Sequence, residues 1–240
     1  MAPMLSLLHE LPLFEDLSSH DLARIAPAFA ARTYARGDQL LGEGGRTESF
    51  LLARGAVRLV RTAPDGRVLG LGLLAEGAVF GHLPFAQVKA EERAEALAES
   101  RVLHVLTRDL ERIAQGCPPV AARLLAEVGI RLGDASERLV GVAFQSVPAR
   151  LASILLELAD RYGRVTPRGV RIDLRLTHGQ LAELVPTTRE TLTKVAGWLR
   201  GEGIASFGRN ELWIDDLPGL EQVVRGERQM PGRGVRSVAA

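Results

Sequence analysis

Cysteine and histidine are scarce in this sequence of 240 residues. Cys117 is the only cysteine, which excludes an internal disulfide framework, a CxxC redox pair and any iron–sulfur or metal site that needs several thiolates. The five histidines are scattered without the spacing of metal ligands, at His9, His20, His82, His104 and His178. The sequence therefore predicts no metal site.

Long apolar runs are also missing. No segment approaches the roughly 18–20 apolar residues that a membrane-spanning helix needs. The first residues, MAPMLSLLHELPLF, lack the basic start of a secretory signal and carry His9 and Glu10 inside their apolar stretch. We therefore expect a cytoplasmic protein with no membrane partner, and the length allows two modest domains or one large one.

The common catalytic motifs are absent as well. The sequence contains no HExxH, no GxSxG and no P-loop. We therefore predict that the protein is not an enzyme. A soluble enzyme that uses a nucleotide or a metal remains the alternative from another class.

The first half of the chain changes pattern near Thr33. Residues 1 to about 30 have helical periodicity, with Ser18 or Ser19 as a candidate cap. From Thr33 to Leu106, short apolar runs such as FLLARGAVRLV alternate with glycine turns. This regular punctuation predicts an antiparallel barrel or roll.

A long helix is predicted from Pro118–Pro119 to about Phe144. Its apolar residues are spaced alternately three and four apart, which is the a/d pattern of a coiled coil. They are Leu125, Val128, Leu132, Ala135, Leu139 and Val142. A helix packed on its own domain is the alternative, but so narrow a stripe favours a symmetric parallel dimer.

Two candidate capping boxes follow, ten residues apart. Thr177 has Gln180 three residues later, and Thr187 has Glu190. Pro186 ends the first helix between them. Each helix has a traceable apolar face: Leu181, Ala182, Leu184 and Val185 in the first, then Leu192, Val195, Ala196 and Leu199 in the second. This spacing predicts a helix–turn–helix.

The second of these helices carries residues suited to DNA. Its N-terminal turn would enter the major groove, where arginine reads guanine and glutamate accepts from cytosine. Threonine hydroxyls and the helix N-terminus can hold phosphate, and the hairpin IASFGRNELWID would rest on the backbone as a wing. The candidate contacts are Thr177, Thr187, Thr188, Arg189, Glu190, Thr193, Lys194 and Arg209.

The alternative is that Arg189 and Glu190 merely form the solvated surface of a capped helix. The net charge of this part of the chain does not distinguish the two interpretations, because the segment from Phe144 onward has 14 Lys/Arg against 11 Asp/Glu, a local excess of only +3. A sensor module that acts through protein partners is a third interpretation.

Several segments together resemble a known family. QLAELVPTTRETLTKVAGWLRGEGI closely resembles the DNA-binding signature of the CRP/FNR transcription regulators. RGDQLLGEGG, FLLARGAVRLV and LAEGAVFGHLPF are similar to the β-roll of that family's sensor domain, and the heptad helix occupies the place of its dimerisation helix.

The resemblance implies an α+β fold in four parts. These are an antiparallel β-roll over residues 1–117, a dimerisation helix over 118–145, a winged helix–turn–helix over 146–225 and a flexible tail over 226–240. It also implies a homodimer on double-stranded DNA with half-sites about 34 Å apart, and RNA polymerase as a partner. Arg189, Glu190 and Lys194 take the base-reading positions.

The effector is less clear from the resemblance. In cyclic-AMP-binding relatives a glycine–glutamate–leucine opens the phosphate-binding cassette, an arginine–serine pair follows, and a threonine–serine pair contacts the adenine. The matching residues here are Gly81, His82, Leu83, Arg93, Ala94, Ala135 and Ser136. Arg93 could neutralise a cyclic phosphate, but His82, Ala94 and Ala135 depart from the pattern.

Losing one buried carboxylate–hydroxyl contact costs about 1.5–3 kcal/mol, so three departures argue against the usual cAMP mode. The resemblance nevertheless implies cyclic AMP as a candidate effector at the β-roll, in a pocket that departs from the family pattern. Open alternatives are a nucleotide held differently, a non-nucleotide signal, a haem bound through His82 or His104, and a regulator active without any ligand.

Overall fold

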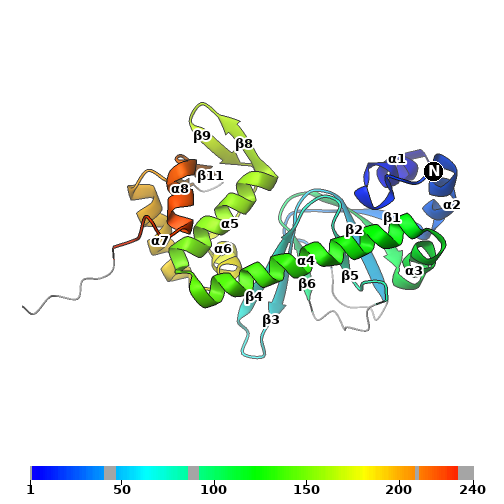
Figure 1. The fold of residues 1–240 in the computed structure, drawn as a ribbon, viewed down its shortest axis with the longest axis horizontal. Coiled ribbons are helices and arrows are strands. Elements are labelled where there is room, and N and C mark those ends of the chain that lie inside the picture. The colour runs from blue at the N-terminus through cyan, green and yellow to red at the C-terminus, as the bar shows by residue number, and fades with distance from the viewer. Residues whose placement is uncertain (1, 41–46, 86–91, 209–210, 232–240) are drawn as a thin grey trace, which may run out of the picture. The chain divides into compact units, whose positions relative to one another are not determined.

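The structure, a computed structural model, describes residues 2–40, 47–85, 92–208 and 211–231 (Figure 1). The chain divides into two compact units, Met1–Glu137 and Arg138–Ala240, and the boundary falls within the long helix α4 (Pro118–Phe144). The predicted α+β class is confirmed, with a β-sheet unit, a long helix and a helix–turn–helix unit.

In the residues that the structure describes, the first unit combines short helices with seven strands. Before α4 its elements are α1 (Ala2–Glu10), η1 (Pro12–Phe14), α2 (Ser19–Ile25), η2 (Ala26–Ala28), β1 (Phe29–Tyr34), β2 (Glu48–Arg54), β3 (Val57–Thr62), β4 (Val68–Leu74), β5 (Val79–Gly81), β6 (Arg93–Ala96), β7 (Ser100–Leu106) and α3 (Thr107–Gly116). All of its strand pairs are antiparallel. One sheet has the order β1-β7-β2-β5 and the other the order β4-β3-β6.

Both faces of β2 are buried within the four-stranded sheet, which explains its continuous apolar run FLLA. Successive side chains on a strand point to opposite faces. Phe50 and Leu52 accordingly join an apolar cluster with residues of the three-stranded sheet. Leu51 and Ala53 join a second cluster with the helices α1, α2, α3 and the start of α4. The roll therefore has an inner core between its sheets and an outer core under its helices.

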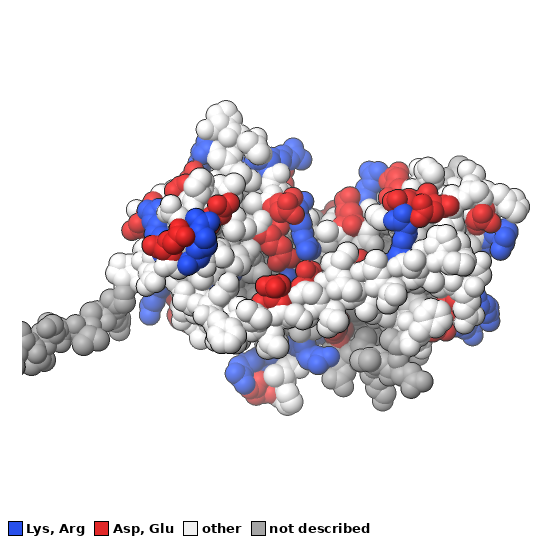
Figure 2. All heavy atoms as spheres, in the orientation of Figure 1, with Lys and Arg blue, Asp and Glu red and all other residues white. Residues whose placement is uncertain are grey.

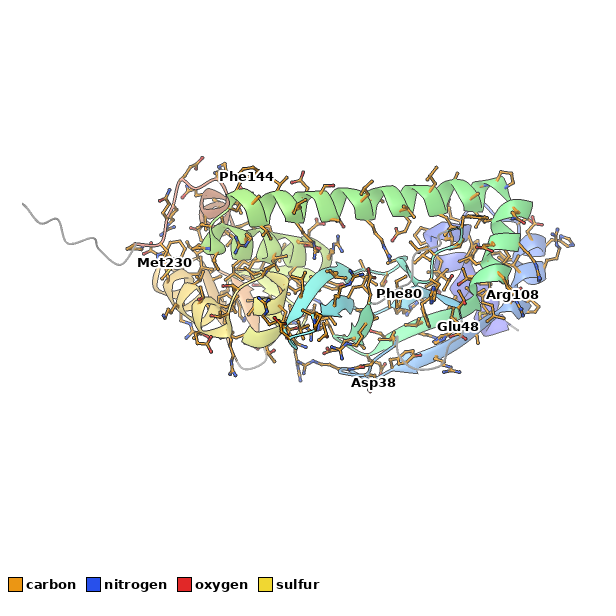
Figure 3. The ribbon with its side chains drawn as sticks, turned by 90° about the horizontal axis from the view of Figure 1, so that it is seen from below. Asp38, Glu48, Phe80, Arg108, Phe144 and Met230 are labelled. Carbon is orange, nitrogen blue, oxygen red and sulfur yellow. The ribbon has the colours of Figure 1, made fainter. Side chains whose placement is uncertain are left out.

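A half-buried polar cluster lies in the roll on strands β1, β2 and β7, around the buried His104. The Tyr34 hydroxyl lies 2.8 Å from His104 Nε2, and the Glu48 carboxylate lies 3.5 Å from His104 Nδ1. Figure 3 labels Glu48. Burial lowers the pKa of His104, and the hydrogen bond that the ring donates to the Glu48 carboxylate only partly opposes this. Both ring nitrogens thus already have partners within the chain, which does not favour His104 as a haem ligand.

The second unit begins with the last residues of α4 and contains its own sheet. Its remaining elements are α5 (Val147–Tyr162), β8 (Gly163–Thr166), β9 (Gly169–Ile172), α6 (His178–Leu184), α7 (Arg189–Gly201), β10 (Ala205–Phe207), β11 (Leu212–Ile214) and α8 (Leu217–Val224). The strands pair antiparallel in the order β10-β11-β9-β8. Ser146 caps α5 by accepting the Ala149 amide, and Pro148 lies in its first turn.

The apolar faces predicted for the helix–turn–helix are confirmed. Leu181, Ala182, Leu184 and Val185 are buried on and just after α6, as are Leu192, Val195, Ala196 and Leu199 on α7. Helix α5 supplies a third buried face with Leu151 and Leu155. Helix α7 contacts both α6 and α5, and these packed apolar faces fix its orientation within this unit.

The heptad face of α4 stays exposed within the single chain. Leu125, Leu132 and Leu139 keep 73%, 68% and 71% of their surface exposed, and Val128 and Val142 are also exposed. Figure 2 shows uncoloured side chains, neither acidic nor basic, gathered along much of α4 on the face in view. Exposed apolar patches of this kind mark interaction surfaces. Among the described residues, no helix has the length and apolar character to cross a membrane.

Candidate nucleic-acid interface and sensor site

Helix α6 begins as the sequence predicts. Thr177 is its N-cap, and its hydroxyl accepts the Gln180 amide at 3.1 Å while the Gln180 side chain accepts the Thr177 amide at 3.0 Å. This reciprocal pair is the predicted capping box. The helix ends at Leu184, before Pro186.

Helix α7 begins one residue later than predicted. Its N-cap is Thr188, whose hydroxyl accepts the Thr191 amide at 3.2 Å, so the capping box proposed for Thr187 and Glu190 is wrong. The Thr187 amide instead donates to the Ala182 carbonyl at 3.0 Å. This bond holds Thr187 in the turn, so Thr188 caps α7 instead.

The shift leaves the candidate DNA contacts on the outer face of α7. Thr188, Arg189, Glu190, Thr193 and Lys194 are all exposed. Thr177 is exposed as well, and Thr187 is half-buried. No ion pair joins Arg189 or Lys194 to another residue in the part of the chain that the structure describes. Their charges are therefore available to an external anion or base.

Glu190 is held in its ionised form. Its own backbone amide and then the Thr188 hydroxyl lower the pKa of its carboxyl, with further contributions from Arg189 and Lys194. A carboxylate only accepts hydrogen bonds. Glu190 is therefore suited to the exocyclic amines of cytosine or adenine, and unsuited to phosphate.

His178 connects three elements beside this face. Its Nδ1 lies 3.2 Å from the Thr193 hydroxyl on α7, and its ring meets Phe207 of β10 edge-on, with centroids 5.8 Å apart. Strands β10 and β11 form the predicted hairpin, and Arg200 also bonds to the Phe207 carbonyl. Arg209, at the predicted tip of the wing, lies outside the described residues.

Arg150 on α5 holds the turn of the helix–turn–helix. Its guanidinium donates to the carbonyls of Val185 at 3.3 Å and Pro186 at 3.4 Å in the turn between α6 and α7. It also donates to the Gln145 carbonyl at 2.8 Å, directly after α4. One side chain therefore satisfies carbonyls at both the turn and the α4–α5 junction.

Sequence reasoning missed both His178 and Arg150. The contact of His178 joins residues fifteen apart, and the contacts of Arg150 reach 35 and 36 residues along the chain. Neither follows a local spacing rule. The only signal was that His178 directly follows the Thr177 cap.

The candidate sensor residues around β5 do not all face one site. Gly81 has φ +82°, and a Cβ there would lie 2.5 Å from Phe50 Cδ2, so only glycine fits. The His82 amide donates to the Glu48 carbonyl at 3.0 Å, and the His82 carbonyl accepts from Ser49. Leu83 packs against the outer core.

Arg93 and Ala94 lie on opposite faces of β6. Ala94 is fully buried in the inner core, whereas Arg93 is exposed and bonded to the Thr62 hydroxyl on β3. The two side chains therefore do not face one common site in this structure. On α4, Ala135 and Ser136 are exposed, and the Ser136 hydroxyl donates to the Leu132 carbonyl at 2.8 Å.

A residue outside the predicted set connects α4 with β5. The Arg131 guanidinium donates to the Val79 carbonyl and lies 3.5 Å from the Glu127 carboxylate. Burial lowers the pKa of Arg131, although Glu127 opposes this. Arg131 therefore links the long helix to the strand that ends at Gly81.

Comparison with known proteins matches both units. Residues 31–117 match the model of the cyclic nucleotide-binding domain, and residues 149–223 match the Crp-like helix-turn-helix domain. The global nitrogen regulator of Synechocystis sp. is 27% identical over 194 residues, which cover 79% of this chain and 86% of that protein. The cyclic AMP receptor protein of Thermus thermophilus is 28% identical over 218 residues, 90% of this chain and 97% of that protein.

A solved structure shows the same fold. A CRP/FNR family transcriptional regulator from Thermus thermophilus superposes with a TM-score of 0.70 at 29% identity, over 82% of this chain and 98% of that one. These related proteins are transcription regulators and not enzymes.

The Thr188 side chain, as the N-cap of α7, should contribute to the stability of the second unit. Replacing Thr188 by alanine should lower the free energy of unfolding of the second unit by about 1 kcal/mol, because the Thr191 amide loses its acceptor. Both tryptophans, Trp198 and Trp213, belong to this unit, so urea unfolding followed by tryptophan fluorescence reports on it. Thr187→Ala is the matched control and should cost clearly less. Equal losses in both variants would contradict the assignment of the cap.

Proposed function

The chain belongs to the CRP/FNR family of DNA-binding transcription regulators, and on that basis we propose that α7 reads a two-fold symmetric operator bound by a homodimer. The observation that carries this proposal is the outer face of α7. It presents Arg189, Glu190 and Lys194 on a helix whose other side is buried. Such a helix is what the major groove admits.

The candidate DNA contacts fall into two groups, one suited to base edges and one suited to phosphate. Arg189 donates in the fork geometry that matches guanine O6 and N7, and Glu190 accepts from an exocyclic amine. Lys194 supplies a compact positive charge beside them. Thr177, Thr187 and Thr188 lie around the starts of α6 and α7, where hydroxyls and amides suit phosphate oxygens. We assign base readout to the first group and positioning to the second, with Arg209 as a further positioning contact on the wing.

The dimer rests on the exposed heptad face of α4. Burying three leucine side chains that are each about 70% exposed would contribute several kcal/mol, at about 25 cal/mol per Å² of apolar surface. Leu125, Val128, Leu132, Ala135, Leu139 and Val142 form the proposed interface. A parallel pair of α4 helices would give the dimer the two-fold symmetry that a palindromic operator requires.

We further propose that cAMP does not switch this regulator through the family's usual contacts. His82 stands where those relatives have a carboxylate, and Arg93 faces away from the buried side of β6. Ala135 offers no hydroxyl. A different ligand of the cyclic nucleotide-binding domain, or regulation by abundance alone, fits these residues better. RNA polymerase is the partner expected of such a regulator, and the cytoplasm is where it would act.

The role of Arg189 can be measured with an operator selected from random duplexes. Arg189→Ala should weaken operator binding by about 1–3 kcal/mol and relax the preference at one base pair per half-site. Arg101→Ala, an exposed arginine on β7, changes the net charge equally and should leave operator affinity unaltered. If the Arg189 variant kept the full preference for operator over random DNA, direct readout by this side chain would be refuted.

The dimer can be tested with two matched charge insertions on α4. Leu132 and Ile130 are 68% and 60% exposed, but only Leu132 belongs to the heptad face. Leu132→Glu should shift the protein towards monomer because it places a carboxylate in the apolar interface. Ile130→Glu should remain dimeric. Sedimentation equilibrium distinguishes the two, and a dimer that survives Leu132→Glu would place the interface elsewhere.

The effector proposal predicts that the purified protein does not bind cAMP detectably, under conditions in which a known cAMP-binding protein does. Calorimetry of the purified protein with cAMP should show no saturable heat, and operator affinity should be the same with and without the nucleotide. The Thermus thermophilus cyclic AMP receptor protein is the control for ligand quality. Saturable binding that tightens operator affinity would overturn the proposal and assign a nucleotide switch to this pocket.

A further inference from the structure

We infer that Thr193 reads DNA through its γ-methyl group, and that the group it recognises is the 5-methyl of a thymine. The inference rests on the proposed function, because it concerns how α7 contacts its operator. It names a specificity-determining residue and the base feature that it selects.

The Thr193 hydroxyl has already used its only proton. Its Oγ1 donates to the Arg189 carbonyl one turn earlier on α7, at 2.8 Å. A hydroxyl carries one hydrogen-bond donor. Thr193 therefore has no proton left for a phosphate oxygen or for a base acceptor such as guanine O6, unless that bond breaks.

The same oxygen is also occupied as an acceptor. His178 Nδ1 lies 3.2 Å from it, and because the hydroxyl proton points to Arg189, the imidazole must be the donor. This fixes the neutral His178 ring as the Nδ1–H form. Burial, followed by Arg189 and Arg200, lowers the pKa of His178, which supports the neutral ring at pH 7.

The donor ring is itself held in place. His178 is the first residue of α6, directly after the capping box at Thr177, and its ring packs edge-on against Phe207 of the wing. Two elements thus aim Nδ1 at Thr193. The hydroxyl is consequently bound on one side by its own helix and on another by His178.

With its proton used and one of its two acceptor sites taken by His178, Thr193 has its methyl group as the larger of its remaining contact groups. The side chain is exposed on the outer face of α7, four residues from Arg189 and next to Lys194. In the major groove only thymine presents a methyl, and a threonine methyl is one of its known apolar partners. The face would then read a guanine through Arg189, an amine through Glu190 and a thymine methyl through Thr193.

The experiment replaces single thymines of the selected operator by deoxyuridine, which removes only the 5-methyl. For the wild type we expect one position per half-site where this lowers affinity about fourfold, the effect of one buried methyl-sized group. Other thymine positions should respond less. The readout is operator affinity by fluorescence anisotropy at fixed salt.

Two variants of opposite chemistry complete the test. Thr193→Val keeps the methyl and loses the hydroxyl, so it should keep operator affinity and sensitivity to deoxyuridine at that position. Thr193→Ser keeps the hydroxyl and loses the methyl, so it should bind thymine and deoxyuridine there equally. The side chain is exposed, so neither change is expected to disturb folding.

The outcomes separate the inference from the proposed function. A wild type that binds operator and random DNA alike would overturn both. Specific binding with no thymine position whose sensitivity disappears in Thr193→Ser would overturn the methyl readout alone. So would a Thr193→Val variant that loses affinity while Thr193→Ser retains it, because the hydroxyl would then be the reading group.

Discussion

Three backbone carbonyls in the second unit accept hydrogen bonds from one side chain, because each nitrogen of the Arg150 guanidinium donates to a different carbonyl. Gln145 directly follows the long helix, and Val185 and Pro186 form the turn that sets α7 against α6. A buried carbonyl without a partner costs about 1–3 kcal/mol. The turn cannot move away from α5 without giving up two such bonds. The outer face of α7, with Arg189, Glu190 and Lys194, therefore depends on a residue that touches none of them.

Local sequence rules predicted the buried faces of α6 and α7, but they placed the N-cap of α7 one residue too early. The apolar faces of α6 and α7 follow from period and caps alone, and every residue expected there is buried. The cap of α7 was assigned to Thr187 because Glu190 completes a capping-box pattern. In the structure the Thr187 amide bonds to Ala182, and Thr188 takes the cap. The pattern cannot decide between adjacent threonines, because the decisive bond comes from the preceding helix.

At the candidate sensor residues, the prediction from family resemblance was limited in a different way. Resemblance aligned Arg93 and Ala94 with two contacts of one pocket, but neighbours on a strand face opposite sides. Ala94 accordingly lies in the inner core and Arg93 on the outside. That outcome was accessible from the strand pattern itself. The contacts of His178, Arg150 and Arg131 were not, since each joins elements that only the tertiary fold brings together.

The exposed leucines of α4 also affect how the amount of DNA-binding dimer depends on the concentration of the chain. Figure 3 shows α4 ending at Phe144, beyond which the DNA-binding elements follow. A pair held together through this face forms by mass action, so below its dissociation constant the number of pairs rises with the square of the chain concentration. On the proposed mode of binding, a single chain would carry one reading helix and contact only half of a palindromic operator. Doubling expression in that regime would raise the operator-competent species about fourfold, which gives gene dosage a steep effect even without any ligand.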